Sequence, residues 1–143
     1  MVKSIKRVLR DSIYTHFTTQ LAAELSSVSV VTAFARNELT PHHIRITTGS
    51  SSPQITGNVN LGRWDIIAAI TVVSQFDDTD EDTQDNLVGL VEAYTLQGNG
   101  VLAGFLTNDV IQVDNLKPGE GIDSVVDGMI YSGQEIEIEC YIK

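Results

Sequence analysis

The segment from Trp64 to Phe76 constrains the fold more than any other part of the chain. One side of this predicted strand carries Trp64, Ile66, Ala68, Ile70, Val72 and Phe76, and the other carries Ile67, Ala69 and Val73. A strand that is apolar on both sides is typical of the centre of a sheet. We therefore predict a central strand here, covered on both faces within the domain or by a neighbouring molecule.

An amphipathic helix is predicted over residues 2–25. Its apolar positions recur every four residues, at Ile5, Leu9, Ile13, Phe17, Leu21 and Leu25. At about 100° per residue, four cations fall within an arc of about 100° beside this stripe. They are Lys3, Lys6, Arg7 and Arg10. This basic flank is either a solvated helix face or a contact to an acidic partner, and both interpretations stay open.

Between this helix and the central strand, the pattern favours further strands. Residues 28–34 form a run rich in β-branched side chains, and residues 43–48 alternate with a period of two. Gly49 to Pro53 has the composition of a loop. Residues 54–63 are compatible with an irregular strand or with an extended arm. The sequence therefore leaves residues 36–63 as a candidate extended loop or arm.

A strongly acidic run, residues 77–85, follows the central strand. A second helix comes next, because Leu87, Leu90, Val91 and Tyr94 have helical spacing. Thr79 or Thr83 is its predicted cap, and acids in a first turn suit the positive end of the helix dipole.

The second helix is expected to end at the glycines around residues 98–100. Residues 101–106 are compatible with a short helix, residues 110–113 with a strand, and residues 117–121 with a turn. The last strand is clear, because residues 135–142 alternate between apolar and acidic positions. Its exposed face would carry Glu135, Glu137 and Glu139.

This order of elements predicts an α+β fold. We expect a mostly antiparallel sheet of about four to six strands, with the N-terminal helix and a second helix packed on it. The 143 residues fit a single domain, and no internal repeat or domain boundary is visible. No apolar run approaches the ~18 residues of a membrane helix, so we expect no membrane association.

Charge is distributed unevenly along the chain. The formal net charge is −10, from 9 basic and 19 acidic residues. Residues 1–76 carry a net charge of +3, and residues 77–143 carry −13. An acidic protein is repelled by nucleic acid, so sequence-specific DNA binding is not expected. Positive and negative surfaces that meet those of neighbours fit the asymmetry better.

Motifs for catalysis or metal binding are not recognisable in the sequence. Asp78, Asp80 and Asp82 have the spacing of an EF-hand loop, but Thr83 and Gly89 stand where that loop requires glycine and glutamate. His42 and His43 are adjacent and would point apart on a strand. Cys140, the single cysteine, is expected to be a buried hydrophobe. We therefore expect no catalytic residues, no metal site and no cofactor.

A family resemblance is carried by the order of these elements over nearly the whole chain. The N-terminal helix and strands precede a strand led by Trp64, a short acidic loop, a helix over residues 87–94 with the sequence LVGLVEAY, and a closing strand with the sequence EIEI at residues 135–138. This arrangement resembles the tail terminator proteins of long-tailed bacteriophages, also called tail-completion or minor tail U-like proteins.

The resemblance implies a structural virion protein that is not an enzyme. Such a subunit would form a homohexameric ring on the last ring of the tail tube, stop polymerisation of the tube and join it to the head connector or neck proteins. It would be assembled in the cytoplasm of the host bacterium, and DNA would pass through its channel without specific binding. Acidic residues facing the channel would repel that DNA. Interaction candidates are therefore Lys3, Lys6, Arg7, Arg10, Asp77, Asp78, Asp80, Glu81, Asp82, Glu135, Glu137 and Glu139.

Three other functions compete with this interpretation. A head-completion or neck protein of the same virion would have a similar size and fold. A small acidic module could bind a divalent cation through the acidic run, or a small hydrolase could use a site without a known motif.

Overall fold

The computed structural model describes residues 4–32, 40–56, 59–75 and 81–143. Three helices and five strands occur in these residues. In chain order they are α1 (Ile5–Gln20), β1 (Ser29–Thr32), β2 (His42–Thr56), β3 (Val59–Gln75), α2 (Glu81–Thr95), α3 (Gly98–Leu106), β4 (Ile111–Val126) and β5 (Met129–Ile142). Among the described residues, no helix is long and apolar enough to cross a membrane.

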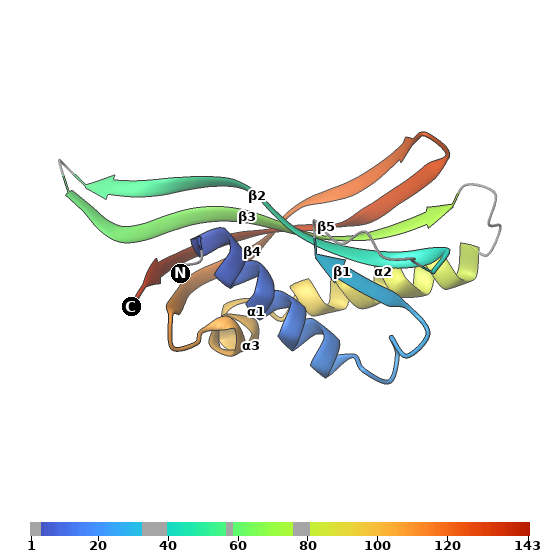
Figure 1. Ribbon diagram of the computed structural model, residues 1–143, viewed down its shortest axis with the longest axis horizontal. Coiled ribbons are helices and arrows are strands. Elements are labelled where there is room, and N and C mark those ends of the chain that lie inside the picture. The colour runs from blue at the N-terminus through green and yellow to red at the C-terminus, as the bar shows by residue number, and fades with distance from the viewer. Residues whose placement is uncertain (1–3, 33–39, 57–58, 76–80) are drawn as a thin grey trace.

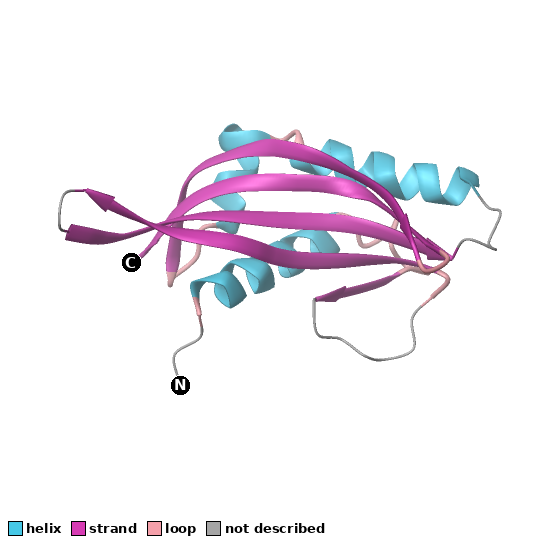
Figure 2. Cartoon of the chain, turned by 90° about the horizontal axis from the view of Figure 1, so that it is seen from above, coloured by secondary structure: helices cyan, strands magenta, loops and turns pink. Residues whose placement is uncertain are grey.

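The five strands form one sheet in the order β1-β2-β3-β5-β4. All neighbouring strands are antiparallel except β1 and β2, which pair in parallel through Ser29–Thr32. The three helices lie against one face of this sheet, as Figures 1 and 2 show. The fold is therefore α+β with a mostly antiparallel sheet, as the sequence predicts.

The central strand lies where its sequence places it, between β2 and β5. Its even-numbered residues Ile66, Ala68, Ile70 and Val72 are buried beneath the helices. On the opposite face Val73 is buried, whereas Ile67 and Ala69 keep part of their surface in contact with solvent. The expectation that both faces of this strand are buried is thus met at Val73. The burial of Ile67 and Ala69 by a neighbouring molecule stays a prediction.

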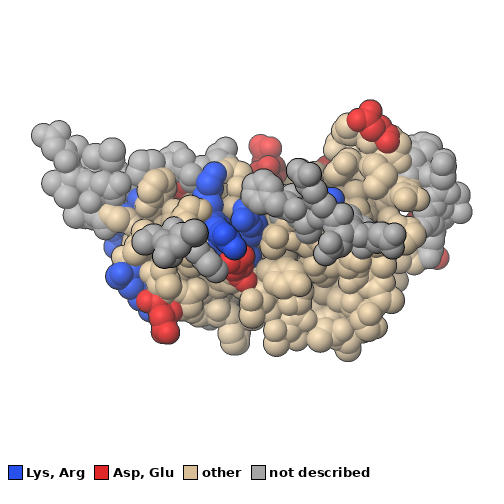
Figure 3. Space-filling model, viewed as in Figure 1, with Lys and Arg blue, Asp and Glu red and all other residues tan. Residues whose placement is uncertain are grey.

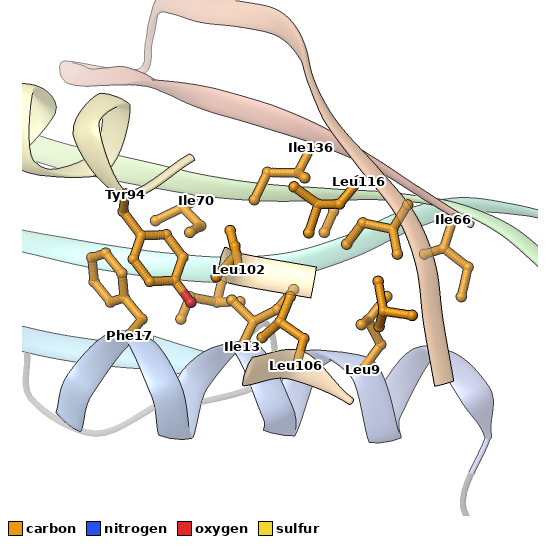
Figure 4. Packing of buried hydrophobic residues seen from close by; sticks show 14 of the residues in the cluster. Leu9, Ile13, Phe17, Ile66, Ile70, Tyr94, Leu102, Leu106, Leu116 and Ile136 are labelled. Atoms are coloured by element: carbon orange, nitrogen blue, oxygen red, sulfur yellow. The ribbon is translucent and has the colours of Figure 1, made fainter. Parts of the chain in front are cut away.

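Helix α1 packs on the sheet through its predicted apolar stripe. Ile5, Leu9, Ile13 and Phe17 are all buried, and Figure 4 shows three of them directed toward the sheet and α3. Ser4 caps the helix by accepting a hydrogen bond from the Arg7 backbone nitrogen at 3.3 Å. The helix ends at Gln20, earlier than the pattern indicates, and residues 21–27 continue as turns in which Leu25 is buried.

Two segments that resemble turns in the sequence are parts of strands. Gly49–Pro53 belongs to β2, where the register shifts between Thr48 and Ser51 relative to β3. Lys117–Gly121 belongs to β4, where a second register shift lies between Pro118 and Gly121. An irregularity in the ladder accommodates an extra residue without ending the strand. The predictions of a loop at Gly49–Pro53 and of a turn at residues 117–121 were therefore wrong.

The long β4–β5 hairpin depends on glycines at two positions. Its two-residue turn is Asp127-Gly128, with φ values of 51° and 75°, the left-handed geometry that a tight hairpin requires. At Gly133, β5 approaches β3 so closely that a Cβ atom would lie 2.1 Å from the carbonyl oxygen of Ile70. Only a residue without a side chain fits there.

Replacing Ile70 by aspartate is expected to abolish folding. The side chain is fully buried in the central strand, and an unpaired carboxylate there would cost several kcal/mol, a large part of the stability of a typical domain. Ile67→Asp is the matched control, because it lies on the partly exposed face three residues earlier in the same strand. Circular dichroism of both purified variants tests this. A folded Ile70→Asp protein would mean that this face of β3 is not the core.

Acidification is expected to destabilise the protein below about pH 6.5. Burial, followed by the charge of Arg45, lowers the pKa of His43, although a hydrogen bond with the Thr40 backbone opposes this. The unfolded chain then binds more protons than the folded one, so stability is complete above the unfolded pKa and declines as the pH falls through it.

Urea unfolding at a series of pH values measures this effect. The decline should be smaller in a His43→Gln variant than in the parent protein. If the free energy of unfolding declined equally in the two proteins, titratable groups other than His43 would be responsible for the acid sensitivity.

Candidate functional site

The acidic row on β5 lies on the face of the sheet that the helices leave uncovered. Ile136, Ile138 and Cys140 are buried, so the alternating Glu135, Glu137 and Glu139 project to the opposite side. Glu137 and Glu139 are exposed, and Glu135 is half-buried. The three glutamates are paired in register with Ala69, Ile67 and Asp65 of β3. The sheet thus presents a carboxylate row beside the partly exposed apolar residues of its central strand.

A shallow hollow of about 310 Å³ lies beside this row. Its polar lining comes from Asp65 of β3, Asn115 and Lys117 of β4, and Glu137 and Glu139 of β5. The Lys117 ammonium lies 3.2 Å from a carboxylate oxygen of Glu137, and both side chains are largely exposed. An exposed ion pair of this kind contributes little stability, so the hollow is better described as a charged surface than as a rigid binding pocket.

A second cation on the same end of the sheet is also engaged locally. Arg63 of β3 forms an ion pair with Asp114 of β4, and its guanidinium lies 5.1 Å from the centre of the Tyr141 ring. Carboxylates nevertheless outnumber cations among the residues that line the hollow. An anionic polymer such as DNA would be repelled by this face.

The basic flank of α1 is only partly exposed. Arg7 is exposed, Lys6 and Arg10 are half-buried, and Lys3 lies outside the described residues. The Arg7 guanidinium is 3.9 Å from the Asp11 carboxylate one helical turn away, with both side chains about half exposed. Such a pair is weak and leaves Arg7 able to contact a partner. The choice between a solvated flank and a contact surface therefore stays a prediction.

The acidic run is described only in part. Asp77, Asp78 and Asp80 lie outside the described residues, whereas Glu81 and Asp82 are exposed in the first turn of α2. Thr83 lies inside the helix and therefore does not cap it, and Thr79, the other predicted cap, lies outside the described residues. The part of the chain that the structure describes contains no group of three histidine, cysteine, aspartate or glutamate side chains that could hold a metal ion.

The buried nucleophile and histidines have structural roles. Burial, with the charges of Asp114 and Asp65, raises the pKa of Cys140 to about 11, so its reactive thiolate is scarce at neutral pH. The Nδ1 atom of His16 lies 2.8 Å from the Tyr94 hydroxyl. His42 contacts the Ser74 hydroxyl at 2.7 Å through Nδ1. Ser74 is buried, so we interpret this serine–histidine contact as structural.

A surface without charge is the feature that sequence reasoning missed. Residues 12–23, which include the second half of α1, and residues 93–108, which include α3, contain no aspartate, glutamate, lysine or arginine. The two segments are joined through His16, which stacks on Phe105 at 4.6 Å, and through paired hydrogen bonds between Gln20 and Gln97 at 3.1 and 3.2 Å. We call this pair of segments the uncharged surface. In Figure 3 the lower middle and lower right of the view contain neither blue nor red atoms, whereas a few charged side chains lie at the lower left edge.

Large apolar side chains are exposed on the uncharged surface. The exposed fractions are 37% for Tyr14, 72% for Leu96, 45% for Val101 and 60% for Phe105. In a chain of which 20% is charged, a charge-free apolar area of this kind is typical of a contact with another protein. The signal was present in the sequence as two uncharged stretches, but only the fold shows that they adjoin.

Comparisons with known proteins add information on the fold alone. The sequence matches no protein-family model, and no curated protein is similar to it. A solved structure that carries no functional description is similar over 99% of this chain and 97% of that chain, with a TM-score of 0.51 and 8% sequence identity. A likeness at this identity supports the architecture and says nothing of activity.

Replacing Phe105 by aspartate should leave the protein folded. We expect the free energy of unfolding to fall by only about 1 kcal/mol, because the ring is mostly exposed and its main loss is the stacking on His16. Binding of a hydrophobic fluorescent dye should fall as well, and Val110→Asp, at an exposed valine outside the uncharged surface, is the control. A loss of several kcal/mol would show that Phe105 belongs to the core.

Proposed function

We propose that this protein is a structural virion protein of a tailed bacteriophage that forms a ring at the junction of head and tail. In this role it ends the polymerisation of the tail tube and joins the tube to the head connector. The proposal rests on the family resemblance of the sequence, with which the α+β fold is compatible.

The observation that carries the proposal is the uncovered, acidic face of the sheet. Glu135, Glu137 and Glu139 form a row there together with Asp65, and the helices cover only the opposite face. A carboxylate lining around a channel repels the phosphate backbone, so that DNA passes without binding. If the four carboxylates face the lumen of a ring, the acidic face of the sheet lies between the DNA and the rest of the subunit.

The uncharged surface supports a protein that works by assembly. It lies on the helical side of the sheet, where exposed Phe105 and Leu96 would be covered by an adjoining protein such as the tail tube subunit. Contacts of this type stabilise an assembly through burial of apolar area, whereas charged surfaces determine its orientation. The two faces of the molecule thus have the different properties that a ring between DNA and protein needs.

A gene deletion in the parent virus tests the proposal. Without the protein, tail tubes should grow beyond their normal length and remain separate from heads, which electron microscopy of the lysate measures. Supplying the wild-type chain or the Val110→Asp variant should restore joined virions, and supplying Phe105→Asp should not. Virions that assemble normally without the protein would refute the proposal, as would its absence from the junction in purified particles.

A further inference from the structure

A groove of about 560 Å³ lies between α2 and the β4–β5 hairpin, apart from the two surfaces already described. Val88 of α2 together with Ile122 and Ile130 of the hairpin provide apolar lining. Three carboxylates accompany them, Asp85 and Glu92 from α2 and Asp123 from β4, and all three are exposed. None of the residues that line the groove is a lysine or an arginine.

The side chains that line this groove favour the binding of a basic segment. An apolar floor with carboxylates at its rim fits a helix or turn that carries apolar stems and cationic ends, because the stems are buried while the charges meet the rim. Within the described chain, Arg63 and Lys117 already pair with Asp114 and Glu137 on their own sheet. At the start of α1, Arg7 makes only the exposed 3.9 Å pair with Asp11. The densest group of cations is the start of α1, with Lys6, Arg7 and Arg10 in two turns.

The groove and the start of α1 are apart from each other in the molecule. In Figure 1 α1 starts left of centre, below β2 and β3, whereas the start of α2 and the β4–β5 turn lie at the right. A single chain cannot join them. Two copies can, and the contact would be head-to-tail, so that the pair keeps one unused groove and one unused helix end for further copies.

We propose that the groove between α2 and the β4–β5 hairpin binds the basic start of α1 from a second copy of this chain. Two molecules with a net charge of −10 repel each other in most orientations, and this orientation opposes that repulsion by placing cations on carboxylates. Repeated around a closed circle, the contact links neighbouring subunits. The inference thus rests on the proposed ring and identifies the surfaces that would hold it together.

Charge reversal on each side of the contact gives a test that distinguishes this arrangement from others. One variant, Lys6→Glu with Arg7→Glu, changes the helix end, and a second, Asp85→Lys with Asp123→Lys, changes the groove. The control is Glu24→Lys with Asp109→Lys, which changes the net charge by the same amount as the groove variant at exposed sites outside the groove. Circular dichroism and thermal unfolding establish that all three are folded.

Sedimentation velocity at low salt is the measurement. The wild-type chain and the control variant should self-associate. Both should dissociate in about 1 M salt, because the Debye length is then only ~3 Å and exposed charges no longer attract each other across the contact. The association constant of each contact variant should be lower than that of the wild-type chain by a factor of about ten or more, which is the loss expected for close interfacial charges. Combining all four substitutions in one chain should restore association, because the opposite charges again face each other.

Mixing identifies the head-to-tail geometry. Helix-variant chains keep an intact groove and groove-variant chains keep an intact helix end, and the two reversed surfaces are also complementary to each other. An equal mixture should therefore form alternating assemblies larger than a dimer, as a head-to-tail contact requires, although each variant alone associates weakly. A monomeric wild-type chain, unchanged association of either contact variant, or a mixture that forms no species larger than a dimer would each overturn the inference. The gene-deletion experiment reports on the ring's place in the virion independently, so failure of one proposal is distinguishable from failure of the other.

Discussion

The packing of α1 on the inner face of the sheet, chiefly on β2, is the interaction on which the rest of the structure depends. The buried side chains of α1 recur every four residues and those of the central strand β3 every second residue, so the helix and the sheet each present one continuous apolar side. β2 and β5 flank β3 and repeat its alternation, with Ile44 and Ile46 on one side and Ile136 and Ile138 on the other. A single apolar layer between helices and sheet results, and the remaining elements extend it.

Because this layer lies on one side of the sheet, the residues on the opposite side are not constrained by packing in the core. The residues on that side need only satisfy strand geometry, and β5 can carry a glutamate at every second position without burying any charge. Interior glutamates at the same positions would be incompatible with folding. The acidic face is therefore a consequence of one-sided packing, and this surface can change its chemistry without changing the core.

The sequence predicts those parts of the fold that have a strong internal period. The α1 stripe and the alternation of β3 and β5 follow from spacing alone. The lengths of β2 and β4 do not, because glycine, serine and proline clusters resemble turns, and a bulge that retains pairing has the same composition. The Asp127-Gly128 turn was a readable hairpin signal, and it would have placed the start of β5 before Glu135.

The candidate surfaces were predictable to different degrees for a related reason. A charged row within one strand, such as Glu135 to Glu139, is local and therefore visible in the sequence. The uncharged surface and the acidic groove each combine segments far apart in the chain, through contacts such as His16 with Phe105 or the approach of α2 to the hairpin. Burial of the core brings these segments together, so surfaces built from distant segments become recognisable only after the packing is known. The same packing places the cations at the start of α1 apart from the carboxylates of the groove, so that these two groups can meet only between molecules.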